Sequence, residues 1–339
     1  MTEIIIILVI NLSVFFVSKF FVKKKFLISQ SGETHQRFTE KLNVPLIIGF
    51  YFFLTFVYVF YNPILLIFLT LIYSLGITSD INFIKSPKKR FFLQALIFIF
   101  FIFFLNLKIL DTRIELINSI LEINFFNFIF VLFCLMVLVN GSNFIDGLNG
   151  LVIGYYLVVS ILLLKTEFFD LLSINDNEIY TYFSTFLIMW IANITRKGFL
   201  GDSGSYLLGS FFGVLIINFH QNHVDISPYY VILLVWYPCF ENLFSIIRKF
   251  NLNNSPIFPD SNHFHQLVFL FIKVKFDMKD IYANNTASTV ILLLVSIFLF
   301  LGSLNPYSTN LQIILLIAFS IIYILLYRFL FKFKLYFKK

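Results

Sequence analysis

Carboxylate and amide side chains gather in three short polar motifs within an otherwise apolar sequence. The motifs are SLGITSDINFIKSPKKRFFLQ (74–94), NGSNFIDGLNG (140–150) and GFLGDSGSYLLG (198–209). They contribute the carboxylates of Asp80, Asp146 and Asp202 and the amides of Asn140 and Asn143. Because ionisable groups are costly at membrane depth, a cluster that recurs at the same end of several apolar segments predicts a functional site.

This combination of side chains suits a hard divalent cation bound to phosphate oxygens. Mg²⁺ typically takes one or two protein oxygens and completes its shell with water and substrate phosphates, and Mn²⁺ is an alternative. Phosphoryl transfer between two anions needs positioning and charge neutralisation, which a metal and cationic side chains provide. Arg248, His263 and His265 follow in a later polar stretch. We expect the glycines of GDSGS and DGLNG to let backbone amides approach a phosphate at helix starts.

Each feature also has a structural explanation. An aspartate at the end of an apolar segment is usually a helix cap, and an Asn-x-x-Asn pair more often joins helices than binds a ligand. SPKKR (86–90) is explained equally well as a basic membrane anchor and as a phosphate-binding segment. The order of the three motifs, the spacing of their residues and their predicted position on one side of the membrane together favour a functional site over these structural explanations.

The elements that carry the motifs are predicted to be membrane-spanning helices. The chain has 339 residues, of which 59% are hydrophobic and 13% charged, and its mean hydropathy is +0.90. This composition excludes an ordinary soluble globular protein. The two cysteines fall in apolar runs, so neither a disulfide framework nor a cysteine metal site is expected. Residues 1–339 are expected to form a single integral-membrane domain, with 248–285 as a cytoplasmic loop carrying the histidines.

We therefore predict an all-α polytopic protein with about eleven transmembrane helices, since about 20 apolar residues cross a bilayer and fewer suffice where it thins. The first run is followed by lysines, which favours a retained span over a cleaved signal peptide. The runs are Ile4–Val22, Val44–Tyr61, Pro63–Ile77, Phe91–Leu107, Phe125–Val139, Leu151–Leu164, Tyr182–Ile194, Leu207–Phe219, Tyr229–Ile247, Thr286–Gly302 and Leu311–Leu330.

The distribution of basic residues predicts the orientation of these spans. Placing the N-terminus outside puts most of the 25 Lys and Arg residues, all three polar motifs, His263, His265 and the C-terminus in the cytoplasm. The outer loops then hold only Lys108, Arg113 and Lys165. The formal net charge of +7 follows mostly from this asymmetry, so membrane lipid is an expected partner and nucleic acid is not.

In their order along the chain, the motifs resemble those of the polyprenyl-phosphate N-acetylhexosamine-1-phosphate transferase superfamily, in its bacterial family 4 branch. The resemblance runs from HQRFTEKLNVPLIIGF (35–50) through the motifs above and WYPCFENLFSIIRK (236–249) to PDSNHFHQ (259–266). It implies an inner-membrane transferase whose active site faces the cytoplasm. Such an enzyme moves an N-acetylhexosamine 1-phosphate, carrying GlcNAc or a related amino sugar, from a UDP-sugar to undecaprenyl phosphate and releases UMP. This is the first membrane step of a cell-surface polysaccharide such as the lipopolysaccharide O-antigen or a cell-wall polymer.

The resemblance also implies roles for individual residues. Asp202 would be a Mg²⁺ ligand with Asn143 as a second, Asp146 would bind the nucleotide sugar or assist the metal, and Asp80 would be the base that deprotonates the lipid phosphate. Six further residues would bind substrates: Asn140, Arg248, His263, His265, His35 and Arg37.

Four positions depart from the usual pattern of this superfamily. Ser79 precedes Asp80 where the family usually has adjacent aspartates, and Asn149 and Glu241 stand where aspartates are frequent. Gln266 ends the histidine motif, which favours a plain amino-sugar donor over a peptidoglycan precursor.

Two other classes of protein remain as alternatives. A secondary transporter would require ionisable groups near span centres and two similar halves. A relative that lost catalysis through Ser79 would act as a binding or scaffold subunit. The sequence leaves open which amino sugar is transferred, which polymer is started and whether the protein forms a homodimer.

Overall fold

The computed structural model describes residues 2–24, 27–28, 43–166, 168–169, 172, 174–251 and 262–337. This part of the chain is helical and contains no strand, apart from an isolated antiparallel bridge between Ile28 and Pro45. The helices are α1 (Thr2–Leu12), α2 (Val14–Lys24), α3 (Ile48–Val59), α4 (Pro63–Asp80), α5 (Pro87–Leu105), α6 (Glu115–Leu121), α7 (Asn124–Ile145), α8 (Leu151–Leu163), α9 (Asp176–Ile194), α10 (Gly201–Asn222), α11 (Pro228–Leu234), α12 (Trp236–Asn251), α13 (Phe264–Lys275), α14 (Asp280–Ser303) and α15 (Thr309–Phe337).

Each predicted apolar run overlaps one or two of these helices, although the ends of runs and helices do not all coincide. Nine runs lie mainly in one helix each, the first spans α1 and α2, and the ninth spans α11 and α12. Among the described residues, five helical segments are long and apolar enough to cross a membrane, or six if α11 and α12 form one bent span. The all-helical architecture with several membrane-capable helices is therefore confirmed for the described residues, while the count of eleven spans and the orientation of the termini stay predictions.

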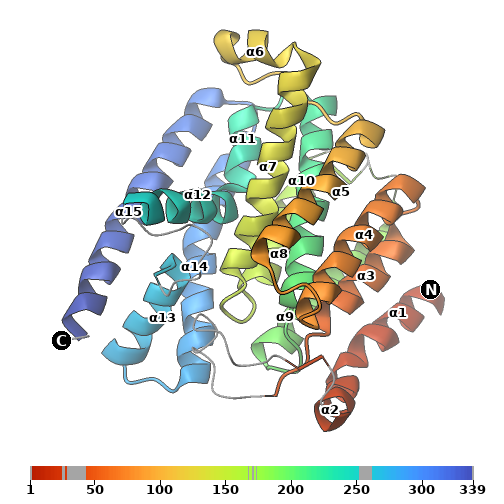
Figure 1. The fold of residues 1–339 in the computed structure, drawn as a ribbon, viewed down its shortest axis with the longest axis vertical. Coiled ribbons are helices and arrows are strands. Elements are labelled where there is room, and N and C mark those ends of the chain that lie inside the picture. Colours follow the sequence, from red (N-terminus) through yellow and green to blue (C-terminus); the bar gives the residue numbers. More distant parts are fainter. Residues whose placement is uncertain are drawn as a thin grey trace.

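The ninth run differs from the straight span that the sequence predicts. α11 and α12 are bent by 78° at Val235, and α12 lies across the bundle (Figure 1). Pro238 has no N–H to donate to the carbonyl of Leu234, so the helix loses a hydrogen bond at this point. The hydroxyl of Tyr155 donates to that carbonyl at 2.6 Å instead. Hydropathy alone does not reveal such a break.

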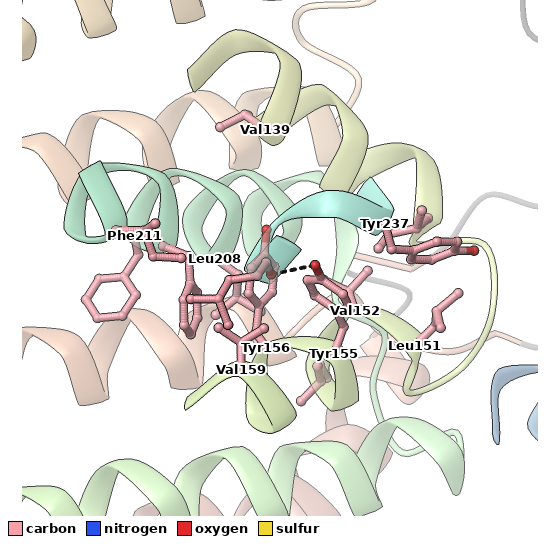
Figure 2. Close-up of a cluster of buried hydrophobic side chains, with 14 of the residues drawn as sticks. Val139, Leu151, Val152, Tyr155, Tyr156, Val159, Leu208, Phe211 and Tyr237 are labelled. Atoms are coloured by element: carbon pink, nitrogen blue, oxygen red, sulfur yellow. Dashed lines mark hydrogen bonds between the residues drawn. The ribbon is translucent and has the colours of Figure 1, made fainter. Parts of the chain in front are cut away.

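Helix α10 forms the centre of the bundle and packs against α3, α4 and α7. It is apolar or small on nearly every face, which is expected for a helix surrounded by other helices. Figure 2 shows Leu208 and Phe211 of α10 close to Tyr156 and Val159 of α8. The Tyr156 ring stacks on Phe212 at 4.3 Å between centroids. This apolar core fixes the position of the first turn of α10.

Polar segments meet at the two ends of the bundle. At one end, Asp80 bonds to the start of α10 and Asn149 bonds to Asn284 of α14. At the other end, Arg113 donates to the carbonyl oxygens of Asp225 and Tyr307. The predicted cytoplasmic motifs thus share one end of the molecule. Within the predicted loop 248–285, the structure has the helix α13 and the first turns of α14.

Candidate active site

The first turn of α10 is held by two aspartates from other segments. Asp80, the last residue of α4, accepts the backbone N–H of Asp202 with Oδ1 at 2.8 Å and that of Ser203 with Oδ2 at 3.0 Å. Asp146, the residue that follows α7, accepts the backbone N–H of Gly201. Two carboxylates thereby satisfy three of the free N–H groups at the helix start.

This arrangement differs from the role expected for the glycines of GDSGS. The sequence predicts that the backbone amides of this turn meet a phosphate, yet they meet the carboxylates of Asp80 and Asp146. A carboxylate is as good an acceptor at a helix N-terminus as a phosphate oxygen, and here it belongs to the chain itself. These three backbone amides are therefore already bonded within the chain.

Close packing of α4 on α10 allows Asp80 to reach this turn. A Cβ atom placed on Gly76 would lie 2.2 Å from the Cα atom of Ser203, so only glycine permits this approach. One helical turn later, Asp80 lies beside the backbone of Asp202 and Ser203. The spacing Gly-x-x-x-Asp in GITSD thus has a direct structural consequence.

The side chain of Asp202 points into a small polar cluster. Its Oδ2 forms a salt bridge with Nη1 of Arg90 at 2.5 Å, accepts a short hydrogen bond from the hydroxyl of Ser79, and lies 3.5 Å from the hydroxyl of Tyr206. The same Nη1 also donates to Ser79 at 2.5 Å. Ser79, which replaces one aspartate of the usual pair, therefore joins Asp202 to Arg90.

Asn143 lies next to the start of α10 as well. The hydroxyl of Ser205 donates to Oδ1 of Asn143 at 3.0 Å and approaches the carbonyl oxygen of Asp202 at 3.3 Å. Carboxylate and amide oxygens of this kind fit Mg²⁺, which needs only one or two protein ligands. In the part of the chain that the structure describes, no three His, Cys, Asp or Glu side chains are grouped as a metal site. The donor set thus suits a cation completed by substrate oxygens rather than an all-protein cage.

Asp146 lies close enough to Asp80 and Asp202 for their charges to affect its pKa. Burial, and then the charges of Asp202 and Asp80, raise the pKa of Asp146 well above its usual range, against the effect of the hydrogen bond from Gly201. The structure therefore brings Asp80, Asp146 and Asp202 together from three separate segments. Their catalytic and metal-binding roles remain predictions.

A network of asparagines supports the loop that follows Asp146. Asn284 accepts the backbone N–H of Asn149 at 2.8 Å, and Asn149 donates its own amide to Asn285 at 3.2 Å. Asn193 of α9 accepts the backbone N–H of Gly150 and donates to the carbonyl of Gly198 at 3.0 Å. Asn149 therefore acts in a buried amide network, and its side chain makes a bond that a carboxylate could not donate.

The histidine motif packs against the same loop. The ring of His263 lies 5.3 Å from that of Phe144, the residue after Asn143, and stacks 5.7 Å from the ring of His265. A Cβ atom on Gly147 would lie 2.3 Å from Nε2 of His265. His263 thus lies against Phe144, two residues before Asp146, and His265 lies against Gly147, the residue after it.

The remaining predicted residues are placed as follows. Asn140 donates to Gln94 at 3.2 Å and to the carbonyl of Met136 at 2.8 Å, so its amide joins α7 to α5. Arg248 lies in the last turns of α12 and donates to Ser245 at 3.2 Å. His35 and Arg37 lie outside the described residues.

Sequence reasoning did not single out Arg90 or Tyr323, and it named Glu241 only as a departure from the family pattern, without its contact with His263. Arg90 belongs to SPKKR, whose charges are equally typical of a membrane anchor, and its pairing with Asp202 is a tertiary contact across 112 residues. Glu241 offered a signal, because a carboxylate within an apolar run is unusual. No pattern in the sequence marks Tyr323 among the many aromatic residues of the last span.

Residues 62–220 match the sequence model of the family described as glycosyl transferase family 4. This segment contains Asp80, Asp146 and Asp202 as well as Arg90. Over this segment the chain is similar to glycosyl transferase family 4.

Curated relatives of this family share low identity with the chain. It is 29% identical over 130 residues to the undecaprenyl-phosphate alpha-N-acetylglucosaminyl 1-phosphate transferase of Thermotoga maritima, with 38% of this chain and 39% of the relative covered. A probable undecaprenyl-phosphate N-acetylglucosaminyl 1-phosphate transferase of Bacillus subtilis is 26% identical over 207 residues, 59% of this chain and 56% of the relative. The phospho-N-acetylmuramoyl-pentapeptide-transferase of Streptococcus sanguinis is 27% identical over 151 residues, 43% and 45% respectively. The matched region thus spans less than two thirds of each of these family 4 relatives.

Proposed function

We propose that this protein transfers N-acetylhexosamine 1-phosphate, with GlcNAc or a related amino sugar, from a UDP-sugar to undecaprenyl phosphate and releases UMP. The observation that carries the proposal is the convergence of Asp80, Asp146 and Asp202 at one end of an apolar helical bundle. The names of the relatives support the polyprenyl acceptor and the phosphosugar. The reaction would be the first membrane step of a cell-surface polysaccharide.

In the proposed reaction, an oxygen of the lipid phosphate attacks the β-phosphorus of the UDP-sugar. A new P–O bond forms, the bond from the β-phosphorus to the bridging oxygen breaks, and UMP leaves with the electron pair. The chain's part is to hold two anions in line and to neutralise their charge. Arg90, His263 and His265 are the cationic or polar groups that lie around the carboxylates for this purpose.

Asp202 and Asn143 are the residues that would hold Mg²⁺. When bound, the metal supplies charge neutralisation at the phosphate oxygens. Oδ2 of Asp202 makes the contacts with Arg90, Ser79 and Tyr206. Both carboxylate oxygens of Asp80 accept backbone N–H groups of α10. This fits a residue that positions Asp202. Whether Asp80 also serves as the base is a separate prediction.

The distribution of Lys and Arg along the sequence supports a site at the cytoplasmic face of the bacterial inner membrane, because the predicted basic loops share their side with the three carboxylates. The transporter alternative requires ionisable groups at mid-span, whereas these three carboxylates lie at helix ends. The scaffold alternative rests on Ser79, yet Ser79 is bonded within the cluster.

The proposal is tested with purified protein, undecaprenyl phosphate and a panel of UDP-N-acetylhexosamines. We expect Mg²⁺-dependent release of UMP with at least one donor and loss of that release when the lipid is omitted. Folded protein that releases no UMP with any donor would overturn the proposal and leave the transporter and scaffold alternatives.

A further inference from the structure

Glu241 is a buried carboxylate in α12 with both oxygens engaged. Its side chain is 1% exposed. Oε1 lies 3.0 Å from Nδ1 of His263 and accepts the backbone N–H of Phe264 at 3.1 Å. Oε2 accepts the hydroxyl of Tyr323, in α15, at 2.5 Å. One carboxylate thus joins α12, the start of α13 and the last helix.

Packing alone does not account for this network. A buried carboxylate carries a large desolvation cost, and an apolar side chain of similar volume usually stabilises such a position as well or better. Glu241 does satisfy the N–H of Phe264 at the start of α13, but a neutral side chain would serve as well. The remaining effect of the carboxylate is on His263.

The network fixes the orientation of the His263 ring. Because an ionised carboxylate can only accept a hydrogen bond, the proton of this contact is assigned to Nδ1, and Nε2 is the second ring nitrogen. The ring also packs against Phe144 and His265, which limits its rotation. Phe144 lies between Asn143 and Asp146, so the ring is held beside the proposed transfer site.

We propose that Glu241 and Tyr323 are positioning residues that hold His263 with Nδ1 toward Glu241 and Nε2 toward the anionic groups of the nucleotide sugar. The inference rests on the proposed function, since it names the residues that orient one of its substrate-binding side chains. Tyr323 acts through Glu241, and Glu241 acts through His263. Neither is expected to touch the substrate.

The test is a double-mutant cycle on UMP release. We expect Glu241→Gln to lower kcat/KM for the UDP-sugar by about 10- to 100-fold, the usual effect of removing an outer partner of an oriented histidine, mostly through KM. Tyr323→Phe should have a smaller effect in the same direction. In a His263→Ala background, neither change should lower kcat/KM further, because the residue they act through is gone.

Tyr182→Phe is the matched control. Tyr182 is also a buried tyrosine with one bonded hydroxyl, donating or accepting at 2.8 Å with Ser160, but it lies in α9 away from the histidines. Tyr182→Phe should leave kcat/KM unchanged. Thermal unfolding in detergent shows whether each variant is folded. If Glu241→Gln protein is not folded, the double-mutant cycle of Tyr323→Phe with His263→Ala tests the inference instead.

The outcomes separate this inference from the proposed function. If wild-type protein releases no UMP, the proposed function falls and the inference with it. If wild-type protein is active but Glu241→Gln and Tyr323→Phe change nothing, or reduce kcat/KM equally with and without His263, the proposed function stands and the inference is overturned.

Discussion

Replacement of Asp80 distinguishes a helix cap from a catalytic base. Asp80 accepts two backbone N–H groups at the start of α10 and is partly buried. Removing a helix N-cap costs about 0.5–2 kcal/mol, and a hydrogen bond to a charged acceptor contributes about 1.5–3 kcal/mol. We therefore expect Asp80→Ala to lower the free energy of unfolding by about 2 kcal/mol and Asp80→Asn, which keeps one acceptor, by about 1 kcal/mol.

Turnover separates the two roles of Asp80. If Asp80 only caps α10, folded Asp80→Asn protein should retain UMP release within about tenfold of wild type, because Asn keeps one acceptor for the start of α10. A general base contributes about 10²- to 10⁴-fold, so under that role Asn should be as inactive as Ala. The assay is UMP release per folded molecule, with unfolding followed in the same detergent.

A cap at the other end of the bundle provides the control. Asn62 accepts the N–H groups of Ile64 and Leu65 at 3.0 and 3.1 Å at the start of α4. Asn62→Ala should cost about 1 kcal/mol of stability and leave turnover unchanged. Loss of more than about 100-fold in turnover for Asp80→Asn, with stability near that of wild type, would refute the cap and support the base.

The other predictions concern the side chains around this turn. Asp202→Asn should reduce UMP release by at least about 100-fold with little loss of folded protein, because it removes a charge without a change of volume; persisting activity would contradict its assignment as a metal ligand. Arg90→Met should raise KM for the UDP-sugar about tenfold while changing stability by less than about 1 kcal/mol, since the pair with Asp202 is partly exposed; an unchanged KM would remove Arg90 from the site. Gly147→Ala should displace His265 and lower turnover, whereas Gly213→Ala, which meets only the side-chain ends of Leu135 and Leu138, should not; equal turnover in the two variants would show that the position of His265 does not matter.

The sequence predicts the parts of this fold that depend on local composition. Apolar runs mark the helices, and span-end positions mark Asp80, Asp146 and Asp202. The basic residues predict that the polar ends of these helices lie on one side of the membrane. The short connections of a helix bundle then bring the three aspartates to the same end of the molecule. The bend at Val235 does not follow, since hydropathy is the same for a straight and a broken span.

The contacts that sequence reasoning missed are those between distant segments. Arg90 and Asp202 meet across 112 residues, and Tyr323 and Glu241 across 82. A single sequence contains no pattern that predicts either contact, because the two residues of each pair lie in segments far apart along the chain. A helix cap is the ordinary explanation of an aspartate at the end of a span, but the sequence does not show that Asp80 caps α10, because this contact depends on the close approach of Gly76 to Ser203.

The most direct test of the account follows the β-phosphorus of the donor. Purified protein is given UDP-GlcNAc, or another UDP-N-acetylhexosamine that supports UMP release, labelled at the β-phosphorus, together with undecaprenyl phosphate and Mg²⁺. The account predicts that label enters the lipid extract in a one-to-one ratio with UMP, and that Asp202→Asn protein produces neither. UMP without labelled lipid, or labelled lipid from the Asp202→Asn protein, would contradict it.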